Sequence, residues 1–369
     1  MNKEDYYWYW FNNIPGIGRI TCHKMLDIFG SPEKLYHAEE REIIKFLNRI
    51  PQREGFSISK DKKQILSSYQ RLGEKGISFI HPESKEYPER LRNIPDAPVG
   101  LYVKGKLPSE RQKAVAIIGT RQCTRYGSEM ARFFGRELAR CGVSIISGLA
   151  RGIDGMAHCG ALEAEGYTMG VLGCGIDVVY PRENYRMFLQ MEEKGGILSE
   201  NNIGIKPSAG LFPERNRLIA GLADGVLVVE AMEKSGTFIT VDQGLEQGKE
   251  ILAIPGRITD SKSLGCNNLV RMGAHIVTGV EDVLEILQVE NKSDCRRLEY
   301  SIEENFAKNA LAPNEKMVYS CLRVDEAKYV DDIIRDAGIA PQEVCMALNH
   351  LVILNVIEET ARNYYAVRI

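Results

Sequence analysis

Runs of consecutive apolar residues, separated by segments with helical spacing, dominate the chain between about residues 115 and 288. Continuous Val, Ile and Leu runs predict strands that are buried on both faces, as in a parallel sheet covered by helices. Their alternation with helical segments predicts an α/β fold, a doubly wound, mostly parallel Rossmann-like sheet. The predicted strands are VAIIG, SIISG, TMGVLG, GILSE, GVLVVE, ILAIPG and AHIVTG.

The pattern changes before residue 111. Residues 1–80 favour short helices with turns, as in a SAM or helix-hairpin-helix-like domain, and the clearest mark of this is IPGIGRITCHKML. The amides of such a Gly-x-Gly turn can touch a DNA phosphate, but the turn more often serves as a tight connection. Residues 81–110 contain prolines at 82, 88, 95 and 98 and predict an extended connection, in which LYVKG forms a short edge strand. The Rossmann-like domain is expected at 111–288.

The last third of the chain predicts a linker and a small separate domain. Residues 289–310 are charged, with weak apolar periodicity, and predict the linker. Three helical segments and a hairpin pattern in residues 311–369 predict a winged-helix-like domain. This domain has six basic and nine acidic residues, a net charge of −3, and its expected recognition helix PQEVCMALNHLV has no lysine or arginine. A role in protein contact or regulation is therefore favoured over insertion into a DNA groove.

Composition narrows the class of protein. A length of 369 residues exceeds one ordinary domain, and the formal net charge of −3 gives no global sign of nucleic-acid binding. Nine cysteines without a CxxC pair predict free thiols in a reducing compartment. The N-terminal run YYWYWF lacks the features of a signal peptide, and no stretch reaches the roughly 20 apolar residues that cross a bilayer. A cytoplasmic protein without membrane contact is expected.

Small and basic residues gather where the predicted strands end. The carboxyl ends of parallel strands meet at one edge of a sheet, where helix starts and arginines are suited to bind an anion. Residues 111–280 hold 19 Lys+Arg and 18 Asp+Glu, so this argument rests on placement. We predict a DNA-binding site with Phe212 as a stacking surface for an unpaired base, although a core Phe212 and an acid-paired Arg215 fit the pattern equally well. The candidate DNA-binding residues from this placement are Gly119, Thr120, Arg121, Ser147, Gly148, Phe212, Arg215, Arg217, Lys234, Ser235, Gly236 and Thr237.

Several enzyme classes lack their signatures. Gly119 is followed by TRQCTRYG, without the second glycine that a dinucleotide requires, and no GxxxxGK[ST] motif is present, so no cofactor is predicted. Asp154 and His158 lie one helical turn apart without a third metal ligand, and we interpret Asp154 as a residue that holds its loop. Glu200 and Glu230 are the other expected cleft carboxylates. Because no catalytic set assembles and no metal site is predicted, a binding protein is favoured over an enzyme.

A series of distinctive motifs runs from residue 115 to about residue 279: VAIIGTR, YG, ISGLARGIDGMAH, VLGCGID followed by YPREN, LSE, FPERNRLIAGL, VVEA, KSGTFIT and AIPG. Taken together, these blocks resemble the DNA-processing protein A (DprA/Smf) family. They occur in family order over nearly half of the chain. The two terminal regions are similar to extra domains that many members carry.

The resemblance implies a single-stranded DNA-binding protein that shields DNA taken up in natural transformation and helps to load the RecA recombinase. It also implies a homodimer formed through the Rossmann-like domain and no catalytic activity. The family motif GSR/GTR falls on Gly119, Thr120 and Arg121, which should hold phosphate. The FPxRNR motif should line the same pocket, with Lys206 upstream as an electrostatic helper; it falls on Phe212, Pro213, Arg215, Asn216 and Arg217.

Two other functions remain open from the sequence. One is a nucleotide-cleaving phosphoribohydrolase of the lysine-decarboxylase-like Rossmann family, although its PGGxGTxxE signature is missing and AIPGRITD and KSGTFITVD repeat only parts of it. The other is a regulatory scaffold without DNA affinity.

Overall fold

The structure, a computed structural model, describes residues 2–39, 41–43, 59–289, 311–323, 326–354 and 356–367. The chain forms two compact units, one of residues 1–123 and 130–295 and the other of residues 124–129 and 296–369. The predicted linker, 289–310, lies outside the described residues except for Val289. No helix in the described ranges is long and apolar enough to cross a membrane.

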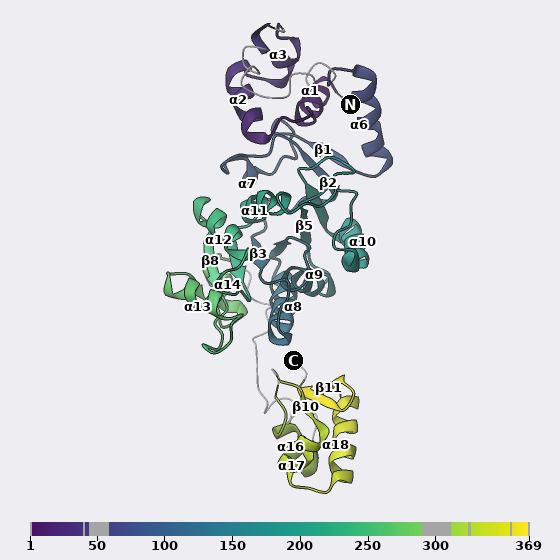
Figure 1. Cartoon of the computed structure of the whole chain (residues 1–369), viewed down its shortest axis with the longest axis vertical. Coiled ribbons are helices and arrows are strands. Elements are labelled where there is room, and N and C mark those ends of the chain that lie inside the picture. The colour runs from purple at the N-terminus through teal and green to yellow at the C-terminus, as the bar shows by residue number, and fades with distance from the viewer. Residues whose placement is uncertain are drawn as a thin grey trace. The chain divides into compact units, whose positions relative to one another are not determined.

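Within the described residues, a nine-stranded sheet forms the centre of the first unit (Figure 1). Its strand order is β1-β2-β6-β5-β4-β3-β7-β8-β9, and every neighbouring pair from β6 to β9 is parallel. The prediction of a doubly wound, mostly parallel Rossmann-like sheet is therefore confirmed. The parallel strands are β3 (Ala114–Ile118), β4 (Ser144–Ser147), β5 (Thr168–Leu172), β6 (Gly196–Ser199), β7 (Gly225–Val228), β8 (Glu250–Ala253) and β9 (His275–Ile276).

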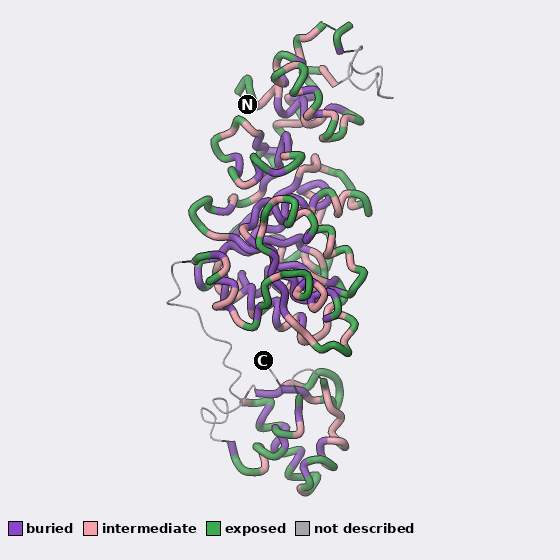
Figure 2. The backbone as a smooth tube through the Cα atoms, turned by 90° about the vertical axis from the view of Figure 1, so that its left-hand side faces the viewer, coloured by how far each residue is buried: buried purple, intermediate pink, exposed green. Residues whose placement is uncertain are grey.

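The central strands send successive side chains into two different hydrophobic cores. In β6, Ile197 packs into one core and Leu198 into the other. In β5, Leu172 shares the core of Ile197, and Met169 shares the core of Leu198. Neighbouring residues of a strand point to opposite faces, which explains why these sequences are apolar without alternation. Figure 2 shows the buried residues concentrated along the middle of this unit.

Helices follow most of the parallel strands and return the chain to the next one. The order of strands reverses at β3, because the chain first proceeds through β4 and β5 to β6 and then crosses back to form β7, β8 and β9 on the other side. Open α/β sheets bind ligands at such a reversal, beyond the carboxyl ends of the strands. The helices are α8 (Arg125–Arg140), α9 (Ile153–Glu163), η1 (Arg182–Asn184), α10 (Tyr185–Lys194), α11 (Leu211–Leu222), α12 (Thr237–Glu246), α13 (Leu264–Arg271) and α14 (Val280–Ile286).

Two antiparallel strands extend the sheet beyond β6. Strand β2 (Leu101–Gly105) pairs with β6, and β1 (Ser78–Ile80) pairs with β2 at the edge. The prediction that LYVKG is an edge strand is therefore wrong, because the SFI segment adds outside it and is too short to give a periodicity signal. Between β1 and β2 the chain forms the short helix α7 (Glu89–Arg92).

Short helices form the described part of the N-terminal region, as predicted. They are α1 (Lys3–Asn12), α2 (Arg19–Phe29), α3 (Pro32–His37) and α6 (Lys62–Glu74). The aromatic run lies on α1, and Trp10 is buried in the same core as Met25 of α2 and Leu72 of α6. The Gly-x-Gly turn directly precedes α2, with Gly18 as its N-cap. Contact of this turn with DNA stays a prediction.

The described part of the C-terminal unit contains the predicted three helices and hairpin, together with one more short strand. The helices are α16 (Pro313–Ser320), α17 (Val330–Ala337) and α18 (Pro341–Ile353). The antiparallel hairpin of β11 (Ile357–Ala361) and β12 (Tyr364–Val367) is joined by β10 (Lys328–Tyr329). These elements enclose a core of their own, which includes Val344 and Leu351 of α18. The winged-helix assignment stays a prediction.

Among the cysteines that the structure describes, one differs from expectation. Cys141 is disulfide-bonded, so the prediction that the cysteines are free thiols is wrong there. Spacing along the sequence does not reveal which thiols the fold brings together. Free thiols in the described part of the chain include those of Cys22, Cys159, Cys174, Cys266, Cys321 and Cys345.

Candidate nucleic-acid interface

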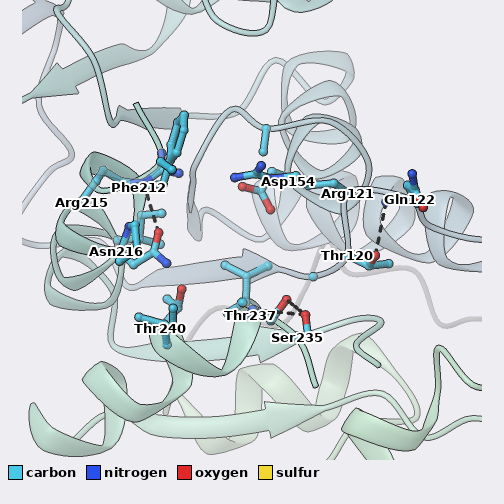
Figure 3. Close-up of a pocket in the computed structure, with 18 of the residues that line it drawn as sticks. Thr120, Arg121, Gln122, Asp154, Phe212, Arg215, Asn216, Ser235, Thr237 and Thr240 are labelled. Atoms are coloured by element: carbon cyan, nitrogen blue, oxygen red, sulfur yellow. Dashed lines mark hydrogen bonds between the residues drawn. The ribbon is translucent and has the colours of Figure 1, made fainter. Parts of the chain in front are cut away.

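A pocket of about 810 Å3 lies at the carboxyl ends of β3, β4 and β7, where the strand order reverses (Figure 3). Its walls come from the turns after β3 and β4 and from the starts of α11 and α12, which are far apart in the sequence. The residues that line it include Gly119, Thr120, Arg121, Gln122, Asp154, Tyr180, Phe212, Arg215, Asn216, Lys234, Ser235, Gly236, Thr237 and Thr240.

The turn after β3 is fixed by backbone hydrogen bonds. The N–H of Thr120 donates to the carbonyl of Glu230 (2.8 Å), and the carbonyl of Thr120 accepts from the N–H of Ile153 (3.3 Å). Gly152 has a φ of +74°, and a Cβ there would lie 2.4 Å from the Thr120 carbonyl oxygen. Only glycine fits this contact. Arg121, which is exposed, therefore projects from a rigid turn.

A cation and two aromatic rings meet at the pocket. The guanidinium carbon of Arg121 lies 5.2 Å from the centroid of the Phe212 ring, which is within the range of a cation–π contact. The ring of Tyr180 lies 5.7 Å from that of Phe212, with 31° between the ring planes, and Tyr180 is 43% exposed. This group offers a planar ligand an apolar surface beside a positive charge.

The buried side chain of Arg215 forms part of the pocket wall and hydrogen-bonds to the backbone. Its Nη1 donates to the carbonyl of Gly148 (2.8 Å) and to that of Val171. The N–H of Gly148 in turn donates to Oδ2 of Asp154 (3.1 Å). A Cβ on Gly148 would lie 2.6 Å from both the Arg215 Nη2 and the Asp154 Oδ2. The close approach of these two charged groups therefore depends on glycine at position 148.

Burial opposes the charge on both members of this pair. It lowers the pKa of Arg215 to about 10, while the Asp154 carboxylate acts in the opposite direction. It raises the pKa of Asp154, against the stabilising effect of the Arg215 guanidinium and of the Gly148 N–H. With its pKa near 10, Arg215 is charged at neutral pH. It therefore adds a fixed positive charge to the same pocket as the exposed Arg121.

The start of α12 forms the opposite wall. The exposed Lys234 precedes Ser235, whose hydroxyl accepts a hydrogen bond from the N–H of Thr237 (3.2 Å) and lies 2.9 Å from the Thr237 hydroxyl. Helix α12 begins at Thr237, so its positive dipole end lies at the pocket. A lysine and a helix start are both suited to an anion.

Three residues expected at this site lie elsewhere. Ser147 is buried, and its hydroxyl donates to the carbonyl of Ile117 (2.6 Å). Arg217 is buried and donates to Glu200 (2.5 Å), so the prediction that it lines the pocket beside Arg215 is wrong. Residues two apart on a helix point in different directions. Lys206 is exposed but is not among the lining residues. Gly148 lines a smaller hollow next to the main pocket, together with Arg121 and Tyr180.

Asp154 holds its loop as predicted, and the neighbouring His158 is part of the core. His158 is fully buried, its Nδ1 lies 2.6 Å from the Thr168 hydroxyl, and burial lowers its pKa to about 3. The imidazole is therefore neutral at physiological pH. Across the described ranges, no group of three or more His, Cys, Asp or Glu residues is placed to hold a metal ion.

Sequence reasoning missed Tyr180, Gln122 and Thr240 as lining residues. Tyr180 stands in the YPREN block soon after the end of β5, so its position at a strand exit carried a signal. A tyrosine before a proline has no distinctive chemistry by itself, and only the fold brings it beside Phe212. Glu200 and Glu230, predicted as cleft carboxylates, do not line the pocket.

The sequence of this chain is similar to those of known proteins. A family model described as DNA recombination-mediator protein A matches residues 78–288, which contain every pocket residue named above. The DNA processing protein DprA of Bacillus subtilis (strain 168) is 38% identical over 255 residues, which cover 69% of this chain and 81% of the relative.

Solved structures agree with the fold. The X-ray structure of DNA processing protein A from Streptococcus pneumoniae matches with a TM-score of 0.67 at 33% identity, covering 76% of this chain and 97% of that one. DNA processing protein A from Helicobacter pylori, whose structure was described for its unique single-stranded DNA binding mode, matches with a TM-score of 0.51 at 30% identity, covering 57% and 95%.

Proposed function

The chain belongs to the DNA recombination-mediator protein A family, and from this membership we propose that its pocket binds single-stranded DNA. The resemblance inferred from the sequence is thereby confirmed at the level of the family. The solved Helicobacter pylori relative, described for its single-stranded DNA binding mode, supports the proposal.

The observation that carries the proposal is the contact between Arg121 and Phe212 above the buried, charged Arg215. Arginine side chains and helix starts bind phosphate, while a partly exposed aromatic ring stacks on a base. Bases of a duplex already stack and pair with each other, so only an unpaired strand offers a free face to Phe212. The pocket should therefore prefer single strands to duplex.

Replacing Phe212 with leucine should reduce affinity for a single-stranded oligothymidylate by about 5- to 150-fold, because one stacked base contributes about 1–3 kcal/mol. Affinity for a duplex of equal length should change less. Fluorescence anisotropy with both DNAs measures the two effects. Phe133→Leu is the matched control, since Phe133 is also a half-buried ring beside an arginine, Arg136, but lies outside the pocket. Equal losses in the two variants would contradict the assignment of Phe212.

We further propose that residues 111–288 form a homodimer and that the bound strand is protected and handed to the RecA recombinase, as in natural transformation. In such a dimer, two pockets on one strand would raise the effective concentration of the second contact and so the overall affinity. The full chain should then have the mass of two copies in solution and should speed assembly of RecA on DNA that is coated with single-strand-binding protein. The mass of a single copy in solution would contradict the dimer. An unchanged rate of RecA assembly would contradict the loading step.

A further inference from the structure

A second pocket, of about 790 Å3, lies along the edge of the central sheet and shares no residue with the proposed DNA pocket. It is bounded by the edge strand β1, by helix α6 and by the start of α1, and Figure 1 shows α6 beside β1. We call it the β1–α6 groove. The residues that define it are Leu66, Tyr69, Gly73, Ser78, Phe79 and Ile80.

The groove follows the backbone of β1 and not one of its faces. Three consecutive residues of this strand, Ser78, Phe79 and Ile80, all line it. Successive side chains of a strand point to opposite faces, so a space that touches all three lies at the strand edge. Within the described residues β1 pairs only with β2. An edge strand turns half of its backbone N–H and C=O groups away from its partner, and the groove that Ser78, Phe79 and Ile80 line lies along this strand.

One face of α6 forms the opposite wall. Leu66, Tyr69 and Gly73 are spaced by three and four residues, so they lie on the same side of the helix. Leu66 and Tyr69 are only partly buried, and a Cβ on Gly73 would meet nothing within 4 Å. A space of this shape, between a free strand edge and an apolar helix face, accepts an extended peptide that adds to the sheet as a strand.

Charge selects among such peptides. Asp5 and Glu86 line the groove, and its described lining contains no lysine or arginine. Glu86 is exposed, while Oδ1 of Asp5 lies 3.2 Å from Nε2 of the buried His81. A strand carrying basic side chains would be attracted here, and an acidic one would be repelled.

We propose that the β1–α6 groove binds an extended basic segment of a partner protein, which adds to β1 as a further strand. The apolar residues of that segment would pack on Leu66 and Tyr69, and its basic residues would reach Asp5 and Glu86. This site is separate from the DNA pocket and stands whether or not the proposed function holds.

The experiment uses the full chain and two fluorescent peptides, one of alternating valine and lysine and one of alternating valine and glutamate. The lysine peptide should bind and the glutamate peptide should not. Gly73→Leu places a side chain into the free space of the groove. It should lower the affinity for the lysine peptide by about tenfold or more. Ser67→Leu, which adds the same side chain at an exposed position of α6 outside the groove, should leave binding unchanged.

Charge reversal gives an independent readout. Glu86→Lys should lower the affinity for the lysine peptide and allow the glutamate peptide to bind. The urea unfolding curves of Gly73→Leu and Glu86→Lys should match that of the wild type, which shows that the fold is intact. Absence of binding by the lysine peptide, or equal binding by wild type and Gly73→Leu, would overturn the proposal.

Discussion

Replacing Arg121 with alanine is expected to lower affinity for a single-stranded oligonucleotide by about 10- to 100-fold at moderate salt, without a change in Tm. Arg121 is exposed and projects from a turn that other residues hold in place, so its loss removes no buried packing. It does remove a charge-assisted contact to phosphate and the cation beside Phe212. A salt series adds a second readout, because loss of one phosphate contact should reduce the slope of log K against log salt by about 0.7.

Arg132→Ala is the control for charge alone. Arg132 pairs with Glu163 and does not line the pocket, so this variant removes one positive charge from the same sheet domain. Its binding curve should match the wild type. Similar losses in both variants would indicate general attraction in place of a defined site, and an unchanged curve for Arg121→Ala would exclude Arg121 from the site.

Replacing Arg215 with methionine should destabilise the first unit by about 3–5 kcal/mol at neutral pH, because it leaves the buried Asp154 carboxylate without its cation. The carbonyls of Gly148 and Val171 would also lose a donor. Both tryptophans of the chain, Trp8 and Trp10, belong to the first unit, so their fluorescence during urea unfolding reports this loss. Adding Asp154→Asn removes the buried charge and should recover part of the stability.

The loss in Arg215→Met should also depend on pH. Burial already raises the pKa of Asp154, and without Arg215 it rises further. A carboxyl whose folded pKa lies above its unfolded value destabilises the fold progressively as pH rises through that interval. The difference from wild type should therefore be largest at neutral pH and shrink in mildly acidic buffer. Wild-type stability at neutral pH, or a loss that grows on acidification, would contradict the role given to this pair.

The sheet could be predicted because its strands are buried on both faces. Side chains such as Ile197 and Leu198 pack into different cores, so the whole strand is apolar and stands out in the sequence. The outer strand β1 has three residues and, among the described strands, pairs with β2 alone, and it left no comparable signal in the sequence. Its position depends on pairing with β2, which is a long-range contact that local pattern does not encode.

The site could be predicted in place but not in detail. Strand ends in a parallel sheet converge, and this alone brought Arg121 and Lys234 to one pocket. The sequence did not distinguish Arg215 from Arg217, because the phase of α11 decides which one faces the pocket and which one pairs with Glu200. It also did not separate the exposed arginine from the buried one, since burial is a property of the assembled layers.

The pocket draws its walls from segments on both sides of the crossover between β6 and β7. It therefore does not exist until β7 has paired with β3, a contact between distant parts of the chain. During synthesis, the capacity to bind a ligand there can therefore arise only after α12 has been made. A ligand held between the two halves would bind the folded chain alone, so it would resist their separation and raise the free energy of unfolding with its concentration.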